Sequence, residues 1–323
     1  MLDTTGPSCT LRDLAAGESV RIQIKAFHEA DGKTDWSDAS PILTAVTTPN
    51  VPTALTQKSA ASDKVTLTWK ASTGASGYQI CQYDSASGSY KKVATSAQTT
   101  CIVSALKPST EYLFTVRALY KVADDTIESG DSAVCTAHTG PAKVTGLTQT
   151  DTTTQGYTLS WKKSANATGY RIYTVDSKTG KTTLIGKTTK TTYAVKKQTA
   201  GQITVYKVKA YTKINGTVYY ATVSDTCQAA ARPAQVTGCK QYQASDNSVW
   251  LKWKTVPNAT SYGVYRYTGD GWKKVKTVKK AKAVITALPS DTTMKFRVRA
   301  FIRLDNLTLS GKYSTAIKAE TDK

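Results

Sequence analysis

One segment of the chain returns three times at a constant distance, and this repetition constrains the fold more than any other feature. The segment reads VTLTWKASTGASGYQI at residues 65–80, and related segments occupy residues 157–172 and 249–264. Each copy carries a tryptophan on one alternating apolar run and a tyrosine on the next. Successive copies lie 92 positions apart, at Trp69, Trp161 and Trp253 and at Tyr78, Tyr170 and Tyr262. A constant period of this length predicts a series of equivalent domains.

Prolines mark the junctions between these copies. Pro49, Pro141 and Pro233 are again 92 positions apart, and proline suits a domain boundary because it fixes φ and lacks a backbone donor. The 323 residues therefore divide into three full repeats and a shorter N-terminal remainder. We expect short, semi-rigid links and an extended array. The expected domains are residues 1–48, residues 49–140 (repeat 1), residues 141–232 (repeat 2) and residues 233–323 (repeat 3).

Apolar residues alternate with polar ones along several short runs in each repeat. In repeat 1, Val65, Leu67 and Trp69 share one face of such a run, because successive side chains of a strand point to opposite faces. Valine, threonine, tyrosine and isoleucine fill these runs, and no helical pattern of ten or more residues stands out. The pattern predicts an all-β chain in which each repeat is a two-sheet sandwich of about seven strands.

The corner motif LKPSTEY at residues 106–112 adds a family signature to this pattern. With the repeated tryptophan on strand B and tyrosine on strand C, the chain resembles tandem fibronectin type III repeats, most similar to those of Gram-positive surface proteins. The resemblance implies immunoglobulin-like β-sandwiches with a corner hydrogen bond at the tyrosine, Tyr112. Thr204 and Met294 replace that tyrosine in repeats 2 and 3, which puts the corner hydrogen bond in question there but not the sandwich.

The N-terminal remainder matches only the second half of a repeat. Five of its residues precede their counterparts in repeat 1 by 92 positions, namely Cys9, Leu14, Ile22, Ile24 and Ala26. Residues 1–48 should therefore hold strands E, F and G of a partial domain without strands A to C′. Three strands cannot close a sandwich core, so one apolar face would be exposed. We favour a fragment of a longer protein, and the alternative is completion by strands from a partner.

The six cysteines do not predict a disulfide framework. Cys9, Cys101, Cys135, Cys227 and Cys239 fall in columns that other repeats fill with apolar, inward-facing residues, where free cysteine behaves as a small hydrophobe. Only Cys81 should point outward, which makes a bridge to Cys101 geometrically awkward. We expect six free thiols.

The sequence offers no catalytic constellation. His28 and His138 lie apart from any cysteine, serine or acidic pattern of a triad or metal site, and no phosphate-binding glycine loop occurs. No long apolar span or signal peptide is present. We expect neither enzymatic activity nor a cofactor or metal, and we expect an extracellular or cell-surface location with the export signal outside this sequence.

Charge is the one biased feature of the composition. The chain carries 43 lysines and arginines against 23 acidic residues, a net charge of +20. Repeat 2 holds 14 basic and 3 acidic residues, and repeat 3 holds 17 and 6, so these two repeats account for the whole positive excess. Basic stripes with aromatic residues can hold an anionic polymer. The alternative is that lysine on solvated strand faces only keeps the sheets soluble and unpaired.

Alternation places specific basic and aromatic residues on the outer faces of repeats 2 and 3. The candidate residues for binding an anion or glycan are Arg171, Tyr173, Lys207, Lys209, Tyr211, Trp250, Tyr265, Tyr267, Arg297 and Arg299. If these faces are functional, replacing Lys207, Lys209, Arg297 and Arg299 by serine should weaken binding. We expect no effect on folding, because all four side chains should face solvent.

Two functional interpretations follow. The first is a non-catalytic spacer or adhesion module of a bacterial secreted or cell-surface protein, and the second is a module that binds a glycan or anionic polymer. Expected partners are a cell-wall polymer, a glycan or another surface protein, with neither nucleic acid binding nor membrane insertion. The chain should be monomeric unless a partner completes residues 1–48.

Overall fold

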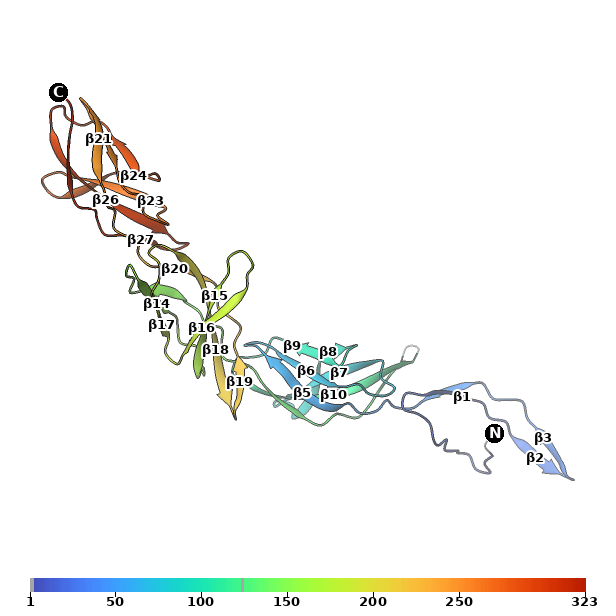
Figure 1. Cartoon of the computed structure of the whole chain (residues 1–323). Helices are drawn as coiled ribbons and strands as arrows, with labels where there is room; N and C mark the ends of the chain where they lie inside the picture. The colour runs from blue at the N-terminus through green and yellow to red at the C-terminus, as the bar shows by residue number, and fades with distance from the viewer. Residues whose placement is uncertain (1–2, 123–124) are drawn as a thin grey trace. The chain divides into compact units, whose positions relative to one another are not determined.

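The computed structural model of the chain describes residues 3–122 and 125–323, and every regular element among them is a β-strand (Figure 1). The chain forms two compact units: Met1–Pro141 with Ile214–Ala221, and Ala142–Lys213 with Thr222–Lys323. The short segment Ile214–Ala221 joins the first unit because its strand β19 (Thr217–Tyr220) packs beside β5 (Thr53–Ala60) of repeat 1.

Repeat 1 folds into two antiparallel sheets. The smaller sheet has the order β5-β6-β9, with β6 at Val65–Lys70 and β9 at Thr100–Val103. The larger sheet has the order β11-β10-β7-β8, and β12 also pairs with β10. Its strands are β7 (Gly77–Asp84), β8 (Ser89–Ser96), β10 (Glu111–Val122), β11 (Asp125–Glu128) and β12 (Cys135–His138).

Repeats 2 and 3 use the same plan. In repeat 2 the sheet β13-β14-β17 faces the sheet β16-β15-β18, and β20 pairs with β18. These strands are β13 (Thr148–Thr150), β14 (Gly156–Ser160), β15 (Gly169–Val175), β16 (Thr182–Thr188), β17 (Thr192–Lys196), β18 (Ile203–Ile214) and β20 (Cys227–Ala230).

In repeat 3 the sheet β21-β22-β25 faces the sheet β24-β23-β26-β27, and β28 also pairs with β26. Its strands are β21 (Lys240–Ser245), β22 (Ser248–Lys252), β23 (Ser261–Tyr267), β24 (Trp272–Val278), β25 (Lys282–Ile285), β26 (Thr293–Arg303), β27 (Thr308–Ser310) and β28 (Ile317–Glu320). The expected all-β fold of two-sheet sandwiches in series is confirmed.

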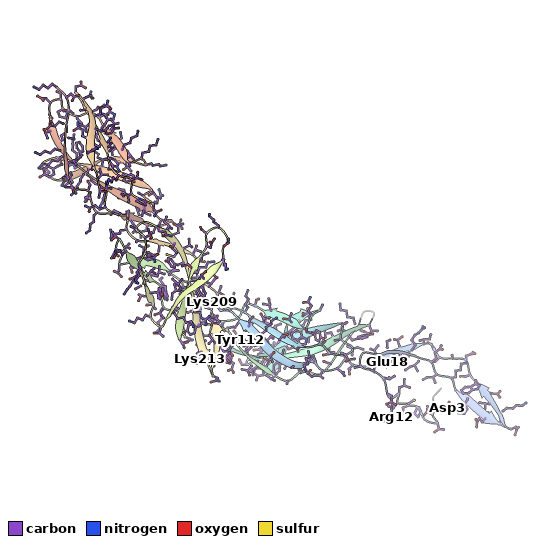
Figure 2. The ribbon with its side chains drawn as sticks, in the orientation of Figure 1. Asp3, Arg12, Glu18, Tyr112, Lys209 and Lys213 are labelled. Atoms are coloured by element: carbon purple, nitrogen blue, oxygen red, sulfur yellow. The ribbon has the colours of Figure 1, made fainter. Side chains whose placement is uncertain are left out.

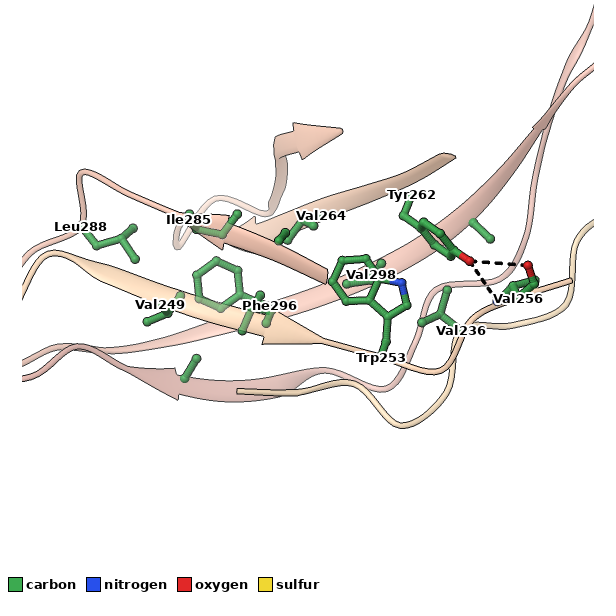
Figure 3. Packing of buried hydrophobic residues seen from close by; sticks show 14 residues of the cluster. Val236, Val249, Trp253, Val256, Tyr262, Val264, Ile285, Leu288, Phe296 and Val298 are labelled. Atoms are coloured by element: carbon green, nitrogen blue, oxygen red, sulfur yellow. Dashed lines mark hydrogen bonds between the residues drawn. The ribbon is translucent and has the colours of Figure 1, made fainter. Parts of the chain in front are cut away.

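The core of each repeat centres on the repeated tryptophan and tyrosine. Trp253, directly after β22, and Tyr262 of β23 come from opposite sheets, and their ring centres lie 5.4 Å apart with planes at 62° (Figure 3). The equivalent pairs of repeats 1 and 2 have ring centres 5.3 Å apart. All three tryptophans are buried, at 5%, 5% and 6% exposure, which confirms the sequence prediction. This edge-to-face geometry is the one that aromatic quadrupoles favour.

The tyrosine also closes the loop that connects the two sheets. The Tyr262 hydroxyl accepts a hydrogen bond from the Val256 backbone N–H at 2.9 Å (Figure 3). Tyr170 accepts from Ser164 N–H at 3.1 Å, and Tyr78 accepts from Ser72 N–H at 3.0 Å in the same way. One side chain therefore fixes both the core and the turn beside it.

We expect Tyr262→Phe to destabilise the protein by about 1–3 kcal/mol, because it leaves the buried Val256 N–H without an acceptor. Tyr242→Phe is the matched control, since Tyr242 is 42% exposed in the same repeat. Urea denaturation monitored by tryptophan fluorescence measures both variants, and equal midpoints for the two would contradict this role.

The corner tyrosine behaves as the resemblance implied in repeat 1. The Tyr112 hydroxyl accepts a hydrogen bond from the Lys107 N–H at 2.7 Å. Repeat 2 contains a different polar pair in its core, Tyr157 and Tyr206, whose hydroxyl oxygens lie 2.7 Å apart. Burial raises the pKa of both hydroxyls, so both stay protonated and share one hydrogen bond. The sequence interpretation did not anticipate this pair.

The N-terminal residues depart from the expected strands E, F and G. Residues around Cys9 form no strand, and the expected strand F is divided into β1 (Ser19–Ile22) and β2 (Phe27–Ala30). β1 pairs with β4 (Leu43–Val46), and β2 pairs with β3 (Lys33–Trp36). Ile24, expected to face inward, is 71% exposed. Among the described residues no second sheet packs against this face, so no core contacts keep strand F in one continuous extended segment.

All six cysteines are free. One of the expected orientations is wrong: Cys9 is exposed because residues 1–48 have no core to receive it. Cys81 points away from the core of repeat 1 as expected, but it is buried rather than exposed to solvent. Burial raises the pKa of the Cys81, Cys101 and Cys135 thiols. It also raises the pKa of Cys227, and it raises that of Cys239 to about 11.

We therefore expect only Cys9 to react rapidly with a disulfide reagent such as DTNB in the native protein at pH 8. The other five thiols have raised pKa values caused by burial, so little thiolate is present at that pH. Release of thionitrobenzoate should show one fast equivalent in the native protein and six in denaturant. A second fast equivalent that Cys81→Ser removes would contradict the burial of that thiol.

Candidate functional site

The basic and aromatic candidates lie on the outer faces of the two larger sheets in repeats 2 and 3. On β15 and β18, Arg171 is paired with Lys209 and Tyr173 with Lys207, and Tyr211 of β18 is paired with Gly169. Lys209 is labelled in Figure 2. The alternate residues of β18 are buried in the core, so the strand period directs these side chains outward.

Trp250 does not belong to this surface. It lies on β22 in the smaller sheet of repeat 3, opposite Gln243 on one side and Val284 on the other. Its side chain is half-buried rather than fully exposed. The structure therefore separates Trp250 from the other candidates, which share the larger sheets.

In repeat 1, acidic side chains neutralise the basic residue that is aligned with Lys209 of repeat 2. Arg117 of β10 precedes Lys209 by 92 positions, and its Nε and Nη1 donate to Asp131 Oδ1 at 2.9 Å and Glu128 Oε2 at 3.0 Å. The hydrogen bonds from Arg117 lower the pKa of the Asp131 carboxyl. The Arg117 guanidinium is therefore paired with acidic side chains of its own repeat, and repeat 1 presents no unpaired cation at this position.

Repeat 2 keeps the cations and loses those acids. Val223 and Tyr220 stand 92 positions after Asp131 and Glu128. Burial lowers the pKa of the Lys209 ammonium, and the positive charge of Arg171 on the neighbouring strand lowers it further. Like charges on paired strands destabilise a sheet unless something compensates them.

Repeat 3 surrounds its two arginines with aromatic rings. The Arg297 Cζ lies 4.3 Å from the centre of the Trp272 ring and 3.5 Å from that of Tyr313. Trp272 comes from β24 and Tyr313 from the segment after β27, on opposite sides of β26 in the sheet. The arginine side chain is consequently stacked and half-buried.

Arg299 continues the same stack. Its Cζ lies 4.7 Å from the Tyr313 ring centre and 5.0 Å from that of Phe301. Its Nε donates to the Tyr265 hydroxyl at 3.2 Å. Tyr265 points outward but is only 7% exposed, because the Tyr313 ring packs edge-on against it at 5.1 Å. Tyr267 is 43% exposed.

These contacts correct one sequence expectation. Lys207, Lys209, Arg297 and Arg299 do not extend freely into solvent, since all four are half-buried. The two arginines also cover aromatic surface with their guanidinium groups. For the arginines we therefore replace the expectation that serine substitutions leave folding untouched with an expected loss of stability.

We expect Arg297→Ser combined with Arg299→Ser to destabilise repeat 3 by about 1–3 kcal/mol, because cation–π stacking on partly buried rings is lost. Lys295→Ser removes an exposed cation from the same strand and is the control. Chemical denaturation compares the free energies of unfolding, and a double variant as stable as the control would show that the stack contributes nothing.

Trp272 and Tyr313 are functional candidates that the sequence interpretation missed. Trp272 opens β24 opposite Tyr267, with ring centres 5.6 Å apart. Tyr313 occupies the loop position that carries Asp131 in repeat 1, since the third repeat is two residues shorter before this point. Comparing that column across repeats would have shown an acid in one repeat and an aromatic residue in another.

The described residues contain no group of three or more histidine, cysteine or acidic side chains that could hold a metal ion. Two depressions of 700 and 470 Å³ lie on the surfaces of repeats 2 and 1. Neither is lined by a histidine or a cysteine, the groups from which a nucleophile with its base is usually built. Over the part of the chain that the structure describes, no helix is long and apolar enough to cross a membrane.

Comparison with known proteins agrees with this architecture. Residues 50–129 match the family described as Fibronectin type III domain. The chain is 27% identical over 278 residues to Exoglucanase B of Cellulomonas fimi, covering 81% of this chain and 25% of that protein. It is 32% identical over 171 residues to Chitinase A1 of Niallia circulans, covering 49% of this chain and 23% of that protein. The chain thus spans about a quarter of the length of these relatives.

Among solved structures, the FN1–FN3 domains of chicken CNTN1 align with 85% of this chain and 99% of that chain, at 17% identity and a TM-score of 0.35. The structure of FN3tt aligns with 28% of this chain and 95% of that chain, at 21% identity and a TM-score of 0.25. The repeated two-sheet sandwich and the family match over residues 50–129 together identify the fold of this chain as fibronectin type III.

Proposed function

We propose that the chain is a non-catalytic spacer module of a larger bacterial extracellular protein that acts on polysaccharide. Two enzymes named for polysaccharide substrates contain sequence similar to this chain over about a quarter of their length. Neither of the two surface depressions among the described residues is lined by a histidine or a cysteine. A spacer must instead hold its neighbours at a defined separation, which requires stable sandwiches and firm joints.

The joint between repeats 2 and 3 is the observation that carries this proposal. Ala230 at the end of β20 packs with Ile302, Leu304 and Leu309 of repeat 3 in a buried apolar cluster. All four are at most 5% exposed. Apolar burial between two domains favours one relative orientation over free rotation.

Polar contacts close the same joint. Arg232 Nε donates to the Thr152 carbonyl at 2.8 Å, and its Nη1 donates to the Ser310 carbonyl at 3.2 Å. Gly201, at φ +77°, approaches Ile302 so closely that a Cβ there would lie 2.6 Å from its Cδ1. A side chain at this position would be strained by the positive φ and would have to displace the Ile302 side chain within the joint.

We expect Leu309→Ala to loosen this joint, because truncating a buried leucine costs about 2–3 kcal/mol. Leu307→Ala is the matched control, since Leu307 is 42% exposed in the same hairpin. Hydrogen exchange of the full chain should accelerate in Leu309→Ala both at β27 and across the joint at β20, by about 30-fold or more. Faster exchange at β27 alone would indicate local damage and would contradict a coupled joint. In a separate assay, hydrolysis of cellulose or chitin by the chain would contradict the non-catalytic role.

Binding of an acidic glycan or other anionic polymer is the second candidate function, and it is compatible with the first. The specific observation in its favour is the difference between repeats at one aligned position: Arg117 in repeat 1 is neutralised by acidic side chains, whereas its counterpart Arg299 in repeat 3 lies among aromatic rings, as does the nearby Arg297. No acidic side chain among the described residues forms an ion pair with Arg297 or Arg299, so their positive charge is available to an anionic ligand. A surface of this kind would attach the spacer to a polysaccharide or to a cell wall.

A further inference from the structure

The guanidinium of Arg297 is stacked in a way that leaves only its edges available. The centres of two rings, those of Trp272 and Tyr313, lie within 4.3 Å of its Cζ. Because Trp272 and Tyr313 approach Arg297 from opposite sides of β26, we place the two rings on the two flat faces of the guanidinium. Hydrogen bonding is therefore possible only in the plane of the guanidinium, where its N–H groups point.

No described residue accepts a hydrogen bond from Arg297. Its Nε is buried without a partner, and its side chain is only partly covered, so the terminal nitrogens Nη1 and Nη2 meet solvent. No acidic residue in the described part of the chain forms an ion pair with it, in contrast to Arg117 with Asp131 and Glu128. The stack holds a charged, planar pair of donors rigidly and gives it no internal acceptor.

A flat apolar surface lies beside this donor pair. Tyr267 is 43% exposed, and its hydroxyl donates to the Gly269 carbonyl at 2.9 Å, which fixes the ring. The Tyr267 ring contacts the edge of Trp272, which itself covers one face of Arg297. The N–H edge of the Arg297 guanidinium and the Tyr267 ring thus lie near each other, because both contact Trp272.

We propose that Arg297 binds the carboxylate of a uronic acid residue in an acidic polysaccharide, with the sugar ring against Tyr267. A carboxylate is planar and offers two oxygens at the spacing of the Nη1 and Nη2 donors, so it forms a bidentate pair. The C–H face of the sugar packs on the exposed aromatic ring. This site deepens the second candidate function, on which it rests, and it confines the specific contact to repeat 3.

The test measures binding of polygalacturonate to the full chain by isothermal titration calorimetry at physiological salt. We expect Arg297→Lys to weaken binding at least tenfold, because lysine keeps the charge but not the planar donor pair. Tyr267→Ala, at an exposed ring, should weaken it several-fold without unfolding the repeat. Lys240→Gln removes one cation from the smaller sheet of the same repeat and should change the affinity less than twofold.

The same polymer with its carboxyl groups reduced to alcohols should not bind, and thermal melting confirms that each variant is folded. Equal affinity of Arg297→Lys and the unaltered chain, or binding of the reduced polymer, would overturn the site while leaving a less specific anion surface in place. Absence of binding by the unaltered chain would overturn the second candidate function itself, and the spacer function would stand.

Discussion

The edge-to-face contact between a tryptophan and a tyrosine supports each repeat, because it joins the two sheets at one point. Trp253 follows the last residue of β22 and Tyr262 lies on β23, so the pair fixes the distance and register of the sheets together. The tyrosine hydroxyl then accepts the Val256 N–H and determines the loop between them. Residues 1–48 show the consequence of lacking such a pair. Their strand F is interrupted, and Ile24 is exposed where Val116, its counterpart 92 positions later, is fully buried.

The parts of the fold that sequence could predict are those fixed by the core. Trp161 is buried because its neighbours alternate with a period of two, and that period leaves one choice of face. The corner hydrogen bond of Tyr112 could be predicted from the local motif at residues 106–112. The outer faces could not be predicted in this way, since no core constrains them. Cys81 points outward as expected, yet Gln79, whose Nε2 lies 3.7 Å from its sulfur, helps to cover it, and the stacking of Arg297 depends on rings from two distant segments.

One backbone position shows how the same fold carries different surface chemistry. In repeat 1 it holds Arg117 within an acidic pair; in repeat 2 it holds Lys209 opposite Arg171; in repeat 3 it holds Arg299 among aromatic rings. The core residues on either side, such as Val298 and Ala300, stay fully buried throughout. Surface chemistry can therefore change on this face while the fold stays the same, because the packing that specifies the fold lies on the other side of the strand.

Strand β26 connects the two proposed functions. Its inward residues Phe296 and Val298 belong to the core of repeat 3, and Ile302 near its end enters the joint with repeat 2. Its outward residues Arg297 and Arg299 form the stacked basic surface. Since successive side chains of a strand point to opposite faces, the joint and the surface are set by different residues of one rigid element. A polymer bound at Arg297 would thus be held on the same strand that positions the neighbouring domain, so attachment and spacing would be mechanically linked without sharing a side chain.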